Sequence, residues 1–170
     1  MASFITLRPG MTRDQLQNLL TDIRQVRIGV LGDFCLDAYW THDASLSEIS
    51  IETGLATRPV RTQRYSLGGA GNVVSNLVAM GVTRVSAFGV LGSDPFGREM
   101  LRILRGFEVD TSGMIVQEQH WDTPVYIKPV EGEAEQPRID FGNANALAPE
   151  NGAALLAALR AALPPSTLSS

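Results

Sequence analysis

The sequence has very little cysteine and histidine, and this scarcity excludes two kinds of stabilising site. Its 170 residues include one cysteine, Cys35, and two histidines, His42 and His120. An intrachain disulfide or a structural zinc site of cysteines and histidines therefore cannot form, and a single thiol suits the reducing cytoplasm in which we expect the protein. No segment approaches the roughly 18 consecutive apolar residues of a membrane helix, and the N-terminal region contains no apolar signal core.

Positive charge is also scarce. Fourteen lysines and arginines stand against eighteen acidic residues and give a net charge of −4. This sign disfavours a protein that holds the phosphate backbone of nucleic acids. The 44% hydrophobic and 19% charged composition is typical of a globular protein, and at this length about 70% of the unfolded surface can be buried. One domain with its own core is expected.

Glycine is relatively abundant, with 16 residues, and several of them follow predicted strands or helices. A capping-box pattern from Thr12 to Gln15 and leucines at helical spacing predict a helix over residues 12–24, within an N-terminal extension of residues 1–25. A strand, turn, helix order then occurs twice, which predicts an α/β fold with a parallel sheet. The predicted elements are a buried strand at 26–31, a helix that ends at Gly81, a strand at 82–91, and a helix from Pro95 to Gly106 that is capped by Asp94.

The remaining segments have a different character. Residues 40–66 and 114–141 contain short polar and β-prone pieces, which predict an excursion from the main sheet and a small meander. A helix rich in alanine and leucine is predicted over 149–163, and the tail at 164–170 has no periodicity. The next strand of an alternating fold is not found in the sequence.

Two carboxylates lie in and just after the turn that follows the first predicted strand, at Asp33 and Asp37. Ligands of open α/β sheets bind outside the carboxyl ends of strands, and a carboxylate there can accept hydrogen bonds from two sugar hydroxyls. The alternative is that one of these side chains caps a turn or a helix.

A second cluster is the glycine-rich turn Gly68-Gly69-Ala70-Gly71-Asn72. Its small residues let a ligand approach the backbone, and the following helix N-terminus offers free N–H donors. Tight entry into a helix explains the same glycines. The turn has neither the Gly-Lys-Ser/Thr ending of a phosphate loop nor the Gly-x-Gly-x-x-Gly dinucleotide pattern, which disfavours a flavodoxin-like or Rossmann-like nucleotide binder.

Basic residues on the predicted polar strands, Arg64, Lys128 and Arg138, are candidates for contacts with a substrate phosphate, although such residues are commonly solvated surface. Cys35 lies between apolar neighbours and has no adjacent histidine, which favours a buried structural thiol over a nucleophile. His42 and His120 have no serine or carboxylate partner at a diagnostic spacing, so a catalytic triad is not supported.

Taken in order, these motifs resemble the N-terminal half of a PfkB-type, ribokinase-like carbohydrate kinase, nearest the heptose-phosphate kinase branch. The resemblance covers residues 26–163, and it rests on Gly32-Asp33 with Asp37, the turn at residues 68–72, Gly81, and Gly89 to Gly97. It implies a doubly wound, mostly parallel sheet with a small β lid at 40–66 and 114–141. It also implies a small-molecule sugar or sugar phosphate as substrate, ATP and magnesium as cofactors of the complete enzyme, and a homodimer that forms through the lid.

The resemblance assigns substrate-binding roles residue by residue. Asp37 matches the carboxylate that holds sugar hydroxyls, Asp33 is its neighbour, and Gly68, Gly69 and Asn72 match the sugar-binding turn. In departures from the family pattern, Val74 replaces a small residue, and the stretch between Gly81 and Gly92 is one residue longer than usual.

The larger departure is that the family's Gly-Ala-Gly-Asp motif does not occur in the sequence. Its aspartate is the general base, which we expect beyond residue 170, together with the ATP-binding half. No catalytic, cofactor-binding or metal-binding residue is therefore assigned here, and the chain alone is expected to be inactive and to bind ATP poorly. The alternative is a complete short module that binds a sugar or a protein without catalysis.

Overall fold

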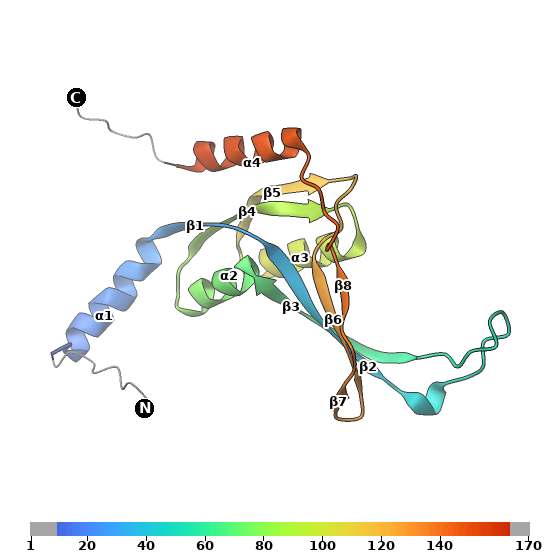
Figure 1. The fold of residues 1–170 in the computed structure, drawn as a ribbon. Coiled ribbons are helices and arrows are strands. Elements are labelled where there is room, and N and C mark those ends of the chain that lie inside the picture. The colour runs from blue at the N-terminus through green and yellow to red at the C-terminus, as the bar shows by residue number, and fades with distance from the viewer. Residues whose placement is uncertain (1–9, 164–170) are drawn as a thin grey trace, which may run out of the picture.

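Two β-sheets share one hydrophobic core in this chain, whose computed structural model describes residues 10–163 (Figure 1). All strands of the first sheet are parallel, in the order β1-β4-β5: β1 (Arg27–Leu31), β4 (Arg84–Gly92) and β5 (Asp110–Gln117). Helices cover both of its faces, with α2 (Ala70–Ala79) and α3 (Pro95–Gly106) on one side and α4 (Pro149–Ala162) on the other. The predicted α/β fold with a parallel sheet is confirmed.

Strand β1 pairs in parallel with β4 as predicted, but the prediction that it is buried is wrong. Val30 is its one buried residue, and Leu31 is 52% exposed. Within residues 10–163, β1 pairs with β4 alone and lies at the edge of the first sheet. Apolar, β-branched residues favour a strand, whereas burial depends on neighbouring elements that the local pattern does not specify.

The second sheet is mixed, and the segment between its strands β2 and β3 projects away from the rest of the molecule (Figure 1). Strand β2 pairs with β3 on one side and β6 on the other, and β6 also pairs with β7 and β8. The strands are β2 (Phe34–His42), β3 (Val60–Gly69), β6 (Val125–Glu131), β7 (Ala134–Glu135) and β8 (Ile139–Phe141), and the projecting segment contains the short 3-10 helix η2 (Ala44–Leu46).

One sequence prediction about this sheet needs correction, and another becomes more definite. Asp37 follows the Gly32-Asp33 turn as predicted, and it lies within β2, which begins at Phe34. The strand expected at 114–116 does not join a meander with the strand at 124–128, because it is part of β5 and pairs with β4 in the first sheet. Both strands are defined by pairing with segments that are distant in the sequence.

The helix ends follow their local signals. Thr12 and Gln15 form the predicted capping box of α1 (Arg13–Asp22), which continues into the short 3-10 helix η1 (Ile23–Gln25). Asp94 caps α3 by accepting a hydrogen bond from the Gly97 backbone N–H, as predicted. The predicted tail at 164–170 and the first part of the predicted N-terminal extension lie outside the described residues.

The core lies where α2 and α3 pack against both sheets. Alternation along β2 places Leu36 and Ala38 in the core, whereas Asp37 and Tyr39 lie on the opposite face of the second sheet. Val74, the departure from the family pattern, is fully buried on α2 and is part of this core. In the part of the chain that the structure describes, no helix has the length and apolar character needed to span a membrane.

Candidate functional site

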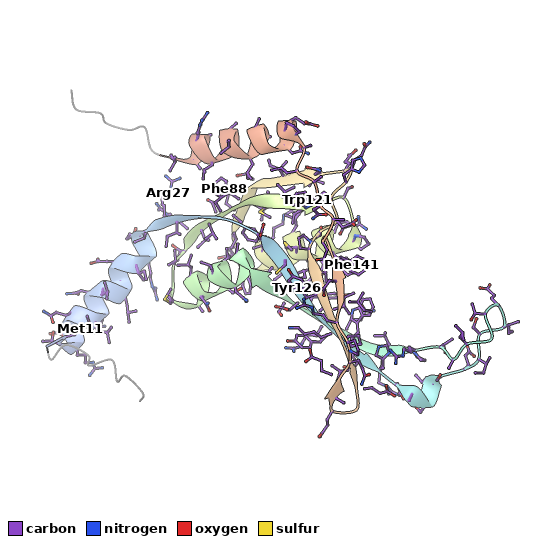
Figure 2. The ribbon with its side chains drawn as sticks, viewed as in Figure 1. Met11, Arg27, Phe88, Trp121, Tyr126 and Phe141 are labelled. Carbon is purple, nitrogen blue, oxygen red and sulfur yellow. The ribbon has the colours of Figure 1, made fainter. Side chains whose placement is uncertain are left out.

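The polar face of the second sheet carries most of the predicted site residues. Asp37 lies in register with Ser66 of β3 and Tyr126 of β6. Tyr39 lies in register with Arg64 and Lys128 on the same two strands. Residues in register project from the same face of a sheet, so this group forms one continuous surface. Figure 2 labels Tyr126 on this part of the molecule.

Lys128 and Asp37 form an ion pair at the centre of this face. The Lys128 Nζ atom lies 2.8 Å from Oδ1 of Asp37 and 3.1 Å from the Tyr39 hydroxyl. The side chains of Lys128 and Asp37 are only 20% and 24% exposed, respectively. The hydrogen bonds to Asp37 and, second, to Tyr39 raise the pKa of Lys128 above its ordinary value. The amine is therefore charged at neutral pH and directed at the carboxylate.

Two tyrosine rings on this face each have a guanidinium group above them. The Arg64 guanidinium lies 4.5 Å from the centroid of Tyr39, and that of Arg138 lies 4.4 Å from the centroid of Tyr126. Arg138 also donates two hydrogen bonds to Asp140, which lies in register with Tyr126. Among the described residues Arg64 has no carboxylate partner, so its charge is the less compensated of the two.

The glycine-rich turn packs directly against both candidate carboxylate residues. A Cβ atom on Gly68 would lie 2.7 Å from the Cys35 sulfur and 3.0 Å from Oδ2 of Asp37. Gly69 has φ of +56°, and a Cβ atom there would collide with the Asp33 carbonyl oxygen. That carbonyl accepts a hydrogen bond of 2.7 Å from the Ala70 N–H. Close packing thus requires both glycines.

The structure brings some predicted residues together and leaves others apart. Asp37, Lys128, Gly68 and Gly69 are close neighbours, and Asp33 joins them through its backbone carbonyl, while Arg138 belongs to the neighbouring pair with Asp140. Asn72 is exposed in the first turn of α2, and its side chain makes no hydrogen bond to another described residue.

Cys35 is a buried thiol on the same face of β2 as Asp37, two residues before it. Burial raises its pKa, and the negative charges of Asp37 and Asp33 raise it further. A protonated, inaccessible thiol is a poor nucleophile, which agrees with the structural role predicted from its apolar neighbours.

A hollow of about 220 Å³ opens at the carboxyl ends of β1 and β4, lined by Asp33, Phe34, Trp121 and Leu147 among others. Figure 2 labels Trp121 in the segment between β5 and β6. The indole Nε1 atom of Trp121 is buried and has no hydrogen-bond partner among the described residues. A larger hollow of about 650 Å³ lies at the amino ends of the same strands, near Arg27 and Arg84, and contains none of the predicted site residues.

The sequence analysis did not identify a buried glutamine that holds together the segment after β5 and the segment before α4. Gln117, at the end of β5, is 3% exposed. Its amide nitrogen donates 2.8 Å hydrogen bonds to the carbonyls of Gln119 and Ala146. Its amide oxygen accepts 3.0 Å hydrogen bonds from the Ala148 N–H and the Asn151 side chain. The local signal of this role is weak, because Gln117 is only the first of several polar residues that follow an apolar, β-prone run.

Residues 10–163 contain no group of three or more histidine, cysteine or acidic side chains arranged to hold a metal ion. Their glycine-rich turn lacks the phosphate-loop pattern as well. No ligand of magnesium or ATP is therefore assigned among the described residues, and no reaction step through either is derived from them.

Residues 32–162 match the pfkB family of carbohydrate kinases. The chain belongs to this family. Among curated relatives, the bifunctional protein HldE of Wolinella succinogenes is 30% identical over 146 residues, which are 85% of this chain and 30% of that protein. HldE of Sulfurimonas denitrificans is 40% identical over 93 residues, which are 54% of this chain and 19% of that protein. The chain thus spans less than a third of the length of these relatives.

Solved structures of low sequence identity share its fold. A carbohydrate kinase from Agrobacterium tumefaciens matches 68% of this chain and 35% of its own length, with a TM-score of 0.52 and 20% identity. Ribokinase from Cryptococcus neoformans, solved with ADP, matches 72% of this chain and 36% of its own length, with a TM-score of 0.50 and 20% identity. The predicted family and the ribokinase-like fold are confirmed.

Proposed function

We propose that this chain is the sugar-binding part of an ATP-dependent carbohydrate kinase, which transfers the γ-phosphate of ATP to a hydroxyl of a sugar or sugar phosphate. Membership of the pfkB family supports this reaction class, and the similarity to HldE proteins supports the heptose-phosphate branch that the motifs indicated. We further propose that the complete protein acts in the cytoplasm, and that the second sheet serves as its lid and dimerisation surface.

The observation that carries the proposal is the setting of Asp37. Its Oδ1 atom accepts a hydrogen bond from Lys128, and its Oδ2 atom packs against Gly68, where a side chain would find no room. A fixed carboxylate has lone pairs for two hydroxyl donors, which suits a pair of neighbouring hydroxyls on a sugar. In this proposal Asp33, Gly69 and Asn72 complete the substrate-binding turn.

The cationic side of the same face supports a phosphorylated substrate. Lys128 lies beside Asp37, and Arg64 presents a guanidinium with little compensation over Tyr39. We propose that Lys128 is the main contact of the substrate phosphate. Arg138 is a further contact, and it gives up part of its hydrogen bonding to Asp140 when it binds the phosphate. The acceptor hydroxyl is then deprotonated by a general base outside this chain, so the chain alone releases no ADP.

A kinase assay of the longer protein that contains this chain tests the proposal. ADP release is measured with ATP, magnesium and a panel of sugars and sugar phosphates, including heptose phosphates. We expect release that depends on one class of sugar, and no ADP release on any of them would refute the proposal. The coding sequence beyond Ser170 provides a cheap companion test, because a Gly-Ala-Gly-Asp motif there supports the kinase and a stop codon supports a module that only binds.

A further inference from the structure

A compact set of hydrogen bonds joins the end of β4 to the start of β6. Asp94 accepts the Gly97 N–H at 2.8 Å with Oδ1 and the Thr123 N–H at 2.8 Å with Oδ2. The hydroxyl of Thr123 accepts the Gly92 N–H at 2.9 Å. Asp94 thus does more than cap α3, which is the role that the sequence predicted. Its second oxygen reaches across to a segment that belongs to the other sheet.

The packing around these hydrogen bonds leaves no room for adjustment. Thr123 is fully buried. A Cβ atom on Gly92 would collide with the Asp94 carboxylate and would lie 2.8 Å from the Trp121 carbonyl oxygen. One on Gly97 would collide with the Gly92 carbonyl oxygen and would lie 2.9 Å from the Thr123 hydroxyl. The two glycines therefore let Asp94 and Thr123 approach the backbone closely, and loss of the Thr123 hydroxyl leaves the N–H of buried Gly92 without its acceptor.

These contacts connect the body of the molecule to the polar face. The carbonyl of Pro124, the next residue, accepts the Leu36 N–H at 2.9 Å, and the β2-β6 ladder continues from there. Lys128 projects from this strand toward Asp37. The end of β4 is in this way linked through Thr123 to the position of the Lys128 amine.

We propose that Asp94 and Thr123 are positioning residues for sugar binding, which hold the start of β6 on the end of β4 and thereby fix the Lys128 amine against Asp37. This inference rests on the proposed function, because it assigns the Asp37 face to the sugar. Neither residue touches the substrate in this arrangement. Their effect is transmitted through the strand that carries Lys128.

The first test uses the longer kinase with matched substitutions at one position. T123V keeps the shape of the side chain but removes the acceptor of the Gly92 N–H, whereas T123S keeps the hydroxyl. We expect T123V to raise the KM for the sugar about tenfold while the KM for ATP stays unchanged, because small displacements of binding groups have effects of this size. T123S is expected to have the same KM for the sugar as the wild-type protein. Equal KM values for the sugar in T123V and T123S overturn the proposal.

The second test needs no kinase activity and uses the 170-residue chain. The W40F substitution leaves Trp121 as the sole tryptophan, since the sequence has two. In this background T123V is expected to shift the Trp121 emission to longer wavelength and increase its quenching by acrylamide, and T123S is not. If no sugar is phosphorylated by the longer protein, the proposed function fails, and this measurement still decides whether the contacts hold the segment.

A changed Trp121 emission together with an unchanged sugar KM would make the contacts purely structural and refute the positioning role. If T123V does not fold, D94N replaces it in both tests. An asparagine has one acceptor oxygen where Asp94 uses two, so either Gly97 or Thr123 loses its partner. The expected results are the same as for T123V.

Discussion

The ammonium group of Lys128 lies 2.8 Å from Oδ1 of Asp37, although 91 positions separate the two residues in the sequence. Strands β2 and β6 run in parallel through this pair, so the contact depends on the register of the second sheet. The Oδ2 atom of the same carboxylate packs against Gly68, where a Cβ atom would lie 3.0 Å from it. One oxygen of Asp37 therefore has a fixed cationic partner, and the other faces the glycine-rich turn.

Removal of the Asp37 carboxylate is expected to affect the sugar and not ATP. Hydrogen bonds to charged groups contribute about 1.5–3 kcal/mol, so D37A in the longer kinase should weaken sugar binding roughly ten- to a hundredfold. Isothermal titration with the sugar and with ATP checks this. D43A is the matched control, because Asp43 directly follows the same strand but is bound by Arg61 and Ser45. Equal losses of sugar and ATP affinity would contradict the assignment.

The Lys128 ion pair predicts a particular dependence of stability on pH. Because the folded state raises the pKa of Lys128 above its ordinary value of 10.5, the stabilisation is complete below that pH and is lost as the pH rises through the folded pKa. The difference in free energy of unfolding between wild type and K128M should stay constant from neutral pH to about 10 and then decrease. Urea unfolding at a series of pH values measures it, with Y39F as background to remove the neighbouring phenol.

Gln117 is expected to contribute strongly to stability. Q117A removes the partner of the Ala148 N–H, the Asn151 amide and the carbonyls of Gln119 and Ala146, and each lost hydrogen bond costs about 0.5–1.5 kcal/mol net. We expect a loss of at least about 2 kcal/mol in the free energy of unfolding of the 170-residue chain, measured by urea denaturation. Q119A removes the same type of side chain from an exposed position and should change stability by less than about 0.5 kcal/mol.

Substitutions at two glycines with positive φ distinguish the destabilisation caused by a steric collision from that caused by backbone strain. G69A adds a Cβ atom that collides with the Asp33 carbonyl, whereas G81A, at φ of +95°, meets no atom within 4 Å. Strain alone costs about 1–3 kcal/mol, so G81A should be destabilised by about this amount and G69A by clearly more. Thermal unfolding of both variants compares them. Equal melting temperatures would show that the turn relaxes away from Asp33.

Features set by neighbouring residues were predictable from the sequence. The Thr12 capping box, the Asp94 cap and the end of α2 before Gly81 each depend on contacts within a few positions. The motif of small residues around Gly68 likewise indicated a close approach of the backbone, which the structure shows against Asp33, Cys35 and Asp37. These signals are local, and the helices and strands of the first sheet follow them.

Features set by distant partners were not predictable in the same way. The sequence around Asp37 resembles a turn followed by polar pieces, and only pairing with β3 and β6 makes it a strand. The strand at 114–116 joins the first sheet because β4 lies beside it. Gln117 receives its partners from segments near Ala146 and Asn151, and no local pattern specifies those hydrogen bonds.

The way the chain crosses between the two sheets has a mechanical consequence. Two residues, Gly32 and Asp33, separate β1 from β2, and β3 runs into α2 at Gly69 without any connecting residue. If the second sheet moves relative to the first, the change in backbone angles at these two crossings must be absorbed by Gly32, Asp33 and Gly69. Substitutions that restrict the backbone at these three positions would therefore oppose any such movement.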